Sequence, residues 1–223
     1  EHDVDLIHEC VVKMAKEISD FMDITPDRQR MDSLMVAANI RNLSLLELFY
    51  TCVTNLCKIM DERGTKIPDE QHHYIEKDDY NKCIYYNRDM DATERTLVVM
   101  KDADILIKIC DSTGDFDDTS EYQLLIRLLK ERTIVDGDGS RRLRQKEEVE
   151  NPSEVLLNPS DPEATFRYKA GGRHLGYVGN IVESVGKNGS LIIDYAYQQN
   201  TYADNQFMKD YLTVQKDFSE GSF

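Results

Sequence analysis

A single carboxylate in an apolar stretch is the first residue of this sequence that points to chemistry. The stretch RMDSLMVAANI, residues 30–40, surrounds Asp32 with methionine, leucine, valine and isoleucine. Such a run predicts a short buried segment, where an unpaired carboxylate costs several kcal/mol. We therefore expect Asp32 to be paired, bound to a metal ion or directed into a cleft. A carboxylate that accepts hydrogen bonds from nearby backbone is the simpler alternative.

Basic side chains gather in two places and are candidates for contacts to phosphate. One group lies within residues 166–174, next to an expected hairpin, and the other is RRLRQK, residues 141–146. Arginine and lysine are common phosphate ligands, and the first group is the better candidate. For both groups the alternative is a solvated surface. The first group consists of Arg167, Lys169, Arg173 and His174.

Cysteines and histidines do not form a recognisable metal-binding motif. The five cysteines are odd in number and none has C-x-x-C spacing, which argues against a disulfide framework and a zinc ribbon. His72 and His73 lie far in sequence from any cysteine, so we do not expect a zinc site. The acidic loops at residues 111–118 and 136–140 lack the spacing of an EF-hand and are interpreted as capping loops.

The net charge and the hydropathy of the chain argue against some classes of binding partner, namely nucleic acids and membranes. The chain has 223 residues and a net charge of -15, whereas a free-standing nucleic-acid-binding protein usually carries a basic face. A local basic patch can still oppose the global sign. No apolar run approaches the roughly 18 residues that a membrane span needs, and EHDVDLIHEC is not a secretory signal. We expect a cytoplasmic protein with no membrane partner.

Hydrophobic periodicity predicts several helices, one isolated strand and one hairpin. Residues 29–37 are the expected strand, and residues 175–199 form the hairpin around the turn Lys187-Asn188-Gly189. Ser44 and Glu47 have the spacing of a capping box. The expected helices cover residues 3–22, 43–62, 91–110, 121–135 and 202–218.

These elements predict an α+β fold. A lone strand is not stable by itself, so we expect the first strand to join the hairpin in one sheet. A helical block is then inserted in the chain between the first strand and the hairpin. The expected parts are an N-terminal helix (1–25), a first strand (26–40), a helical insertion (41–140), a linker (141–174) and a hairpin with a final helix (175–223).

Two long stretches resemble the DDE-type insertion-sequence transposases. They are RQRMDSLMVAANIRNLSLLELFYTCV (28–53) and NPSDPEATFRYKAGGRHLGYVGNIVES (158–184). In that family an Asp-Ser or Asp-Thr pair lies on the first strand of an RNase H-like sheet. A helical segment beginning NI-x-x-LSRLEL follows, and an S/P-x-DP-[DE]-A stretch precedes GYxGxI on the next strand. All these pieces occur here in the same order.

The resemblance implies a partial RNase H-like sheet with a large helical insertion, and a function in cutting and joining DNA. The family uses Mg²⁺ or Mn²⁺ for phosphoryl transfer. Asp32 matches the first of three catalytic, metal-binding acidic residues, and Ser33 is its neighbouring hydroxyl. The basic group at residues 167–174 would contact DNA, and Asp161 of the DP motif is a weaker candidate. Partners would be the element ends, the target DNA and a second copy of the chain.

The sequence also departs from the family. The second acidic residue belongs to an AD-G-Y-like strand after the helix that follows the hairpin, and the third is a later glutamate; neither motif is present. Asp194 and Asp204 do not match these positions, and Leu45 replaces a usual basic residue. We therefore expect a transposase fragment that is inactive alone. The alternatives are a non-catalytic module that binds or inhibits a full-length transposase, and an unrelated acidic helical regulator.

Overall fold

The computed structural model describes residues 5–24, 28–86, 90–169 and 171–220, with side chains in the last segment up to residue 215. Two compact units make up the chain. The sheet unit comprises Glu1–Asn39 and Thr165–Phe223, and the helical unit comprises Ile40–Ala164. Helices and antiparallel sheets occur together, which confirms the predicted α+β class.

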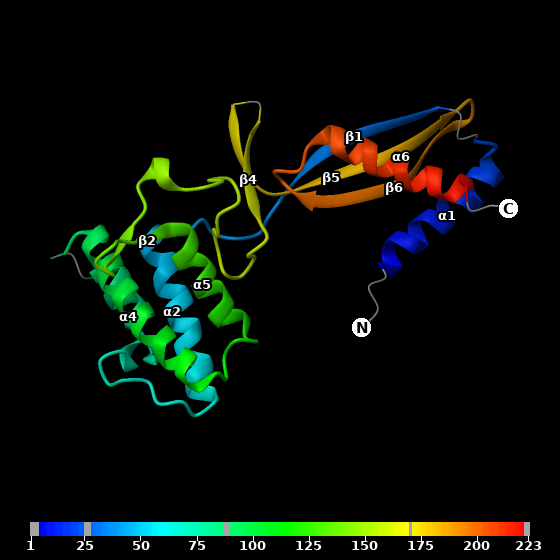
Figure 1. Ribbon diagram of the computed structural model, residues 1–223. Coiled ribbons are helices and arrows are strands. Elements are labelled where there is room, and N and C mark those ends of the chain that lie inside the picture. Colours follow the sequence, from blue (N-terminus) through cyan, green and yellow to red (C-terminus); the bar gives the residue numbers. More distant parts are fainter. Residues whose placement is uncertain (1–4, 25–27, 87–89, 170, 221–223) are drawn as a thin grey trace. The chain divides into compact units, whose positions relative to one another are not determined.

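One long strand organises the sheet unit (Figure 1). β5 pairs antiparallel with β1, so that Asp32 lies opposite Ile181, and it also pairs antiparallel with β6. This confirms that the first strand joins the hairpin in one sheet. β4 pairs with the first residues of β5. The strands are β1 (Gln29–Ala37), β4 (Thr165–Lys169), β5 (Gly172–Gly186) and β6 (Gly189–Gln199).

Three strands meet at Gly176. It lies opposite Ala37 of β1 and opposite Thr165 of β4, so these two strands flank β5 on opposite edges. Its φ is +136°, and a Cβ atom there would lie 2.3 Å from the carbonyl oxygen of Val36. Only glycine fits this backbone without strain. The close approach of β1 to β5 therefore depends on this residue.

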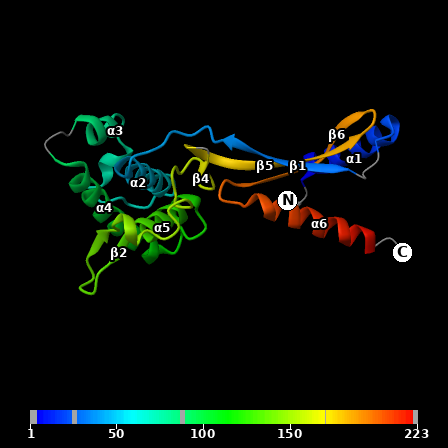
Figure 2. The ribbon, with the colours of Figure 1, turned by 90° about the horizontal axis from the view of Figure 1, so that it is seen from above.

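Two helices lie in the described part of the sheet unit, α1 (Leu6–Met22) and α6 (Asp204–Glu220). Helix α1 contacts β6, and α6 runs along one face of the sheet (Figure 2). Phe207 of α6 is buried and, together with Met31 and Val182, lines a hollow beneath the helix. Much of the apolar surface of α1 is exposed, since Ile7 is 71% and Phe21 is 91% accessible.

The long helices in the described part of the helical unit are α2 (Leu45–Glu62), α4 (Ala92–Thr113) and α5 (Ser120–Arg132). α2 contacts both of the others (Figure 1). Ser44 and Glu47 form the predicted capping box, which satisfies backbone donors at the start of α2. The fully buried core side chains include Phe49, Val53, Leu56, Met60, Met100, Leu106, Phe116, Leu125, Leu128 and Leu156.

Two sequence expectations for this region are wrong. The helix expected to reach residue 135 ends at Arg132, because the β-branched run that follows pairs as β2 (Thr133–Val135) with β3 (Arg141–Leu143). The segment 141–174, expected to be an extended connection, instead contains β3, the short helix η3 (Lys146–Glu148) and β4.

A short irregular segment precedes α4. It contains the 3-10 turn η1 (His72–Ile75), the helical turn α3 (Asp79–Asn81) and the π-helical turn η2 (Lys82–Tyr86). Within the described residues, no helix is both long enough and apolar enough to cross a membrane.

Candidate functional site

Asp32 lies in the middle of β1 and is exposed. The expectation that it stands in a buried segment is therefore wrong. Its side chain shares one face of the sheet with Leu34, Ile192 and Tyr197, each about half exposed. Because these neighbours are themselves open to solvent, the carboxylate remains hydrated and does not need a buried partner. Arg30, two residues away on the same face, forms an ion pair with Glu183.

A hollow of about 320 Å³ lies beside Asp32 in the sheet unit. Ser33 and Asn180 contribute polar groups, and the Asn180 side-chain amide donates a 3.0 Å hydrogen bond to the Ser33 hydroxyl. Alternation along β1 directs the Asp32 carboxylate to the face opposite Ser33. Asp32 thus borders the hollow. Lys169 and Asp204 also line it.

The four predicted DNA-contacting residues do not form a single patch. Arg167 lies opposite His174 in the β4–β5 pairing, and Lys169 follows on the same face. Arg173 is on the other face, where its guanidinium lies 4.4 Å from the centre of the Phe166 ring. The structure therefore brings three of the four residues together and separates the fourth.

Asp204 reduces the positive charge of this patch. Its carboxylate lies 3.6 Å from Nη1 of Arg167 and 3.7 Å from Nζ of Lys169. Asp194 is held elsewhere, 2.5 Å from Nε2 of His8. Neither acidic residue therefore stands beside Asp32 as a second free carboxylate.

By themselves, these residues do not fit a Mg²⁺ or Mn²⁺ ion. Mg²⁺ takes about six oxygen ligands in a regular octahedron, usually with one or two carboxylates from the protein. Two carboxylates line the hollow, Asp32 at its border and Asp204, and the latter is already paired with Arg167 and Lys169. The ammonium group of Lys169 also repels a metal ion. We derive no catalytic step through a metal at this place.

The second basic group, residues 141–146, is used within the helical unit. Arg141 pairs with Asp104 at 2.9 Å. Arg142 donates two 2.8 Å hydrogen bonds to Glu148, and these bonds lower the pKa of Glu148 to about 2. Arg144 donates to the backbone carbonyl of Glu148. With its arginines engaged in this way, the group is a poor candidate for phosphate.

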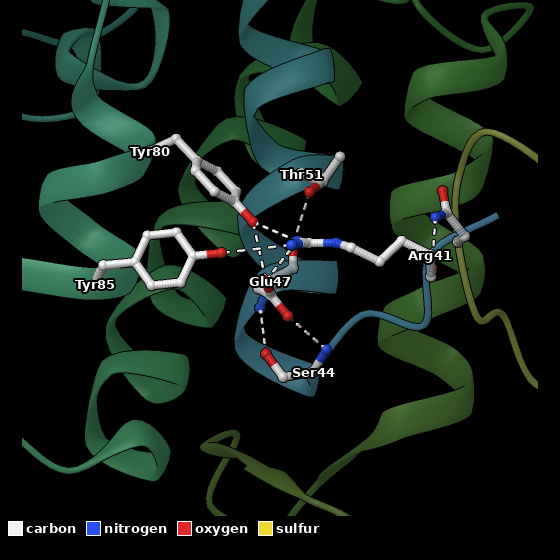
Figure 3. Close-up of polar contacts among 7 residues, drawn as sticks. Arg41, Ser44, Glu47, Thr51, Tyr80 and Tyr85 are labelled. Carbon is white, nitrogen blue, oxygen red and sulfur yellow. Dashed lines mark hydrogen bonds and ion pairs between the residues drawn. The ribbon is translucent and has the colours of Figure 1, made fainter.

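The LSLLEL stretch has a local structural role (Figure 3). Arg41 donates to a Glu47 carboxylate oxygen at 2.5 Å and to the Tyr80 hydroxyl at 2.7 Å. Glu47 accepts from the backbone N–H of Ser44 at 2.8 Å. Burial opposes ionisation of Glu47, but the hydrogen bonds from Ser44 and Tyr80 outweigh it, so the pKa of Glu47 is lowered. This cluster fixes the start of α2.

Two further residues of the resemblance lie in structural positions. Leu45 packs against the core of the helical unit, so this position contributes an apolar contact here. Asp161 lies in a turn in which the N–H of Ala164 donates to its carbonyl oxygen. Arg127 donates to the carbonyl of Pro162 at 2.7 Å and attaches this turn to α5.

One polar cluster was not predicted from the sequence. The Asp79 carboxylate oxygen Oδ2 lies 2.5 Å from the Tyr50 hydroxyl, 3.0 Å from Nδ1 of His73 and 3.5 Å from Sγ of Cys83. His73 and Cys83, which are ten residues apart in the sequence, therefore both contact the same carboxylate oxygen. The spacing H-x5-D-x3-C was the available signal, since residues four apart on a helical turn share one face.

Electrostatics make this cluster unsuited to nucleophilic catalysis. Burial and the adjacent Asp79 raise the pKa of Cys83 to about 12, so the thiol stays protonated while no metal ion is bound. Burial opposes ionisation of Asp79, but the hydrogen bonds from Tyr50 and His73 outweigh it and lower the pKa of Asp79. The cluster is thus a buried carboxylate with three hydrogen-bond donors.

No protein-family model matches this chain, and comparisons with curated proteins and with solved structures find no significant match.

Proposed function

We propose that this chain is part of a DDE-type transposase and that Asp32 is the first of its catalytic carboxylates. The supporting observation is the strand order β1–β5–β6 in one antiparallel sheet, followed by helix α6. This is the order that the resemblance implies for an RNase H-like sheet: the strand with the Asp-Ser pair, the hairpin and a helix. Asp32 and Ser33 lie in the middle of that first strand.

The open edge of β1 is part of this proposal. Among the described strands, β1 pairs with β5 alone, so its other edge presents unpaired backbone groups. In the family the second acidic residue follows on a later strand, and this edge is available to it. Since Asp32 is the only one of the three carboxylates that this sequence supplies, the 223-residue chain is proposed to bind DNA without cleaving it.

DNA is the proposed partner, and the face with Arg167, Lys169 and His174 is the proposed contact. The proposal includes a cytoplasmic location, which the free thiols of all five cysteines support. Asp204 limits the affinity, because it offsets part of the charge of Arg167 and Lys169. Removing the Asp204 charge is therefore expected to strengthen DNA binding, whereas removing the Lys169 charge weakens it.

Fluorescence anisotropy with a labelled DNA duplex over a series of salt concentrations tests this contact. Lys169→Ala is expected to weaken binding and to reduce the salt slope by about 0.9, the value for one lost phosphate contact. Asp204→Asn is expected to strengthen binding. Lys146→Ala removes the same charge from an exposed position in the helical unit and serves as the matched control. Equal affinities for Lys169→Ala and Lys146→Ala would contradict the proposed contact.

A second candidate function is a protein interaction module. The observation that favours it is the exposure of large apolar side chains in the sheet unit, such as Phe21 of α1 and Leu34 of β1. Large exposed apolar surfaces mark interaction sites. This function predicts metal-independent self-association that Phe21→Glu reduces in sedimentation velocity experiments. Val98→Glu, at an exposed apolar position of α4, is the control. A monomer at all concentrations would contradict self-association.

A further inference from the structure

We propose that His73, Asp79 and Cys83 bind one zinc ion in the helical unit. The site is independent of the proposed transposase function and uses none of its residues. The three side chains come from η1, α3 and η2, one from each of three consecutive turns. Nitrogen and sulfur donors favour zinc over the hard cations Mg²⁺ and Ca²⁺.

The distances between the ligand atoms fit a tetrahedral ion. Oδ2 of Asp79 is 3.0 Å from Nδ1 of His73 and 3.5 Å from Sγ of Cys83, and all three ligand atoms lie within 4.8 Å of one another. Zinc bonds of about 2.0–2.3 Å at tetrahedral angles place ligand atoms roughly 3.3–3.6 Å apart. Small side-chain rotations therefore convert the hydrogen-bonded cluster into a coordination shell.

The charges of the site also balance. Zinc carries two positive charges, and the Asp79 carboxylate with the Cys83 thiolate carries two negative ones, while His73 binds as neutral imidazole. On binding, the Cys83 thiol releases its proton to solvent, and His73 carries its remaining proton on Nε2. A neutral complex suits Asp79, which is only 5% exposed, because a buried net charge is costly. The fourth position is left to water, as in open zinc sites.

The surroundings provide support and access. The Tyr50 hydroxyl, 2.5 Å from Oδ2 of Asp79, orients the carboxylate from α2. A hollow of about 100 Å³, lined by His73, Cys83 and Asp102 among others, adjoins the ligands. Arg95 is the cation that also lines this hollow, and its Nη1 donates to the carbonyl oxygens of Cys83 and Ile84. Asp102 contributes a carboxylate to the lining of the same hollow.

Cobalt titration of the full chain tests the site. The protein is freed of metal with a chelator, kept reduced and titrated with Co²⁺, whose absorption reports tetrahedral coordination and thiolate binding. We expect one Co²⁺ per chain with a thiolate charge-transfer band, which Zn²⁺ then displaces. Cys83→Ser is expected to abolish the band, and His73→Ala to weaken binding strongly. Cys10→Ser and His72→Ala, at exposed positions, are the matched controls and keep the band.

Two further measurements separate the site from a folding defect. Tyr50→Phe keeps all three ligands and is expected to weaken Zn²⁺ binding about 10- to 100-fold, as for other residues that orient a ligand. In the unmodified protein, Zn²⁺ is expected to protect Cys83, identified by peptide mapping, from alkylation. An unmodified protein without the charge-transfer band would overturn the proposal. So would a band that Cys83→Ser retains, or Cys83 alkylation that Zn²⁺ does not slow.

Discussion

Replacing Gly176 by alanine tests whether β1, and with it Asp32, is held in the sheet as described. A Cβ atom at this position would lie 2.3 Å from the carbonyl oxygen of Val36 and 2.5 Å from the backbone nitrogen of Ala38. Both neighbours are backbone atoms, so no side chain can rotate away. The residue also has a φ of +136°, which side-chain-bearing residues rarely adopt.

The expected loss follows from two contributions. Strained backbone at such a φ costs about 1–3 kcal/mol. Relieving the clash moves β1 away and breaks the 3.0 Å hydrogen bond from the Ala38 nitrogen to the Leu175 carbonyl, which adds about 1 kcal/mol. We therefore expect Gly176→Ala to lower the free energy of unfolding of the sheet unit by about 2–4 kcal/mol.

Urea denaturation followed by circular dichroism measures the loss, and hydrogen exchange of the β1 amides locates it. Gly171→Ala is the matched control, because its φ is +77° but a Cβ atom there has no neighbour within 4 Å. We expect the control to lose only about 1 kcal/mol. A Gly176→Ala variant that is no less stable than Gly171→Ala, with β1 amides still protected, would refute the described contact between β1 and β5.

Three further predictions concern local features. Ser44→Ala removes a helix cap and should lower the free energy of unfolding of the helical unit by about 1 kcal/mol, measured in urea. Glu47 has a lowered pKa in the folded state, so its ionised form should stabilise the fold above about pH 4.5, and this stabilisation should be lost as the pH falls further. In the Glu47→Gln variant, the urea concentration at the unfolding midpoint should therefore change less with pH in that range. Cys10 is exposed whereas Cys52 is buried with a raised pKa, so Cys10→Ser should remove the fastest-reacting thiol detected with a disulfide reagent.

Features encoded by neighbouring residues were predictable from the sequence. The capping box at the start of α2 needs residues three apart, and the β5–β6 hairpin turns at Lys187 and Asn188, between the paired Gly186 and Gly189. Both were predicted and both are present. The α+β class and the pairing of β1 with the hairpin followed from counting these elements, because an isolated strand must find a sheet.

Features set by distant contacts were not predictable. Asp32 is exposed because its face of the sheet remains open, and composition alone does not reveal which face a layer covers. The start of β5 and all of β4 lie within a proline- and glycine-rich stretch whose local signal indicated a connection. Asp79 and Cys83 of the proposed zinc site are four residues apart, but the turn between η1 and α3 is what brings His73 to Asp79.

The same distinction applies to the predicted DNA contacts. The sequence places Arg167, Lys169, Arg173 and His174 close together, but the strand pairing puts Arg173 on the opposite face. Asp204, which is distant in sequence, then offsets part of the remaining charge. A basic stretch in a strand therefore divides between two faces, and its net potential depends on residues from other elements.

DNA strand cleavage by the product of the whole reading frame that contains this chain tests whether Asp32 is a catalytic carboxylate. The assay follows nicking of a supercoiled plasmid with Mn²⁺ and compares the unmodified protein with Asp32→Asn and with Asp20→Asn, an exposed aspartate of α1. We expect Asp32→Asn to reduce nicking to background and Asp20→Asn to leave nicking unchanged. Nicking that survives Asp32→Asn, or a reading frame that supplies no further catalytic acidic residues after α6, would contradict the proposed role of Asp32.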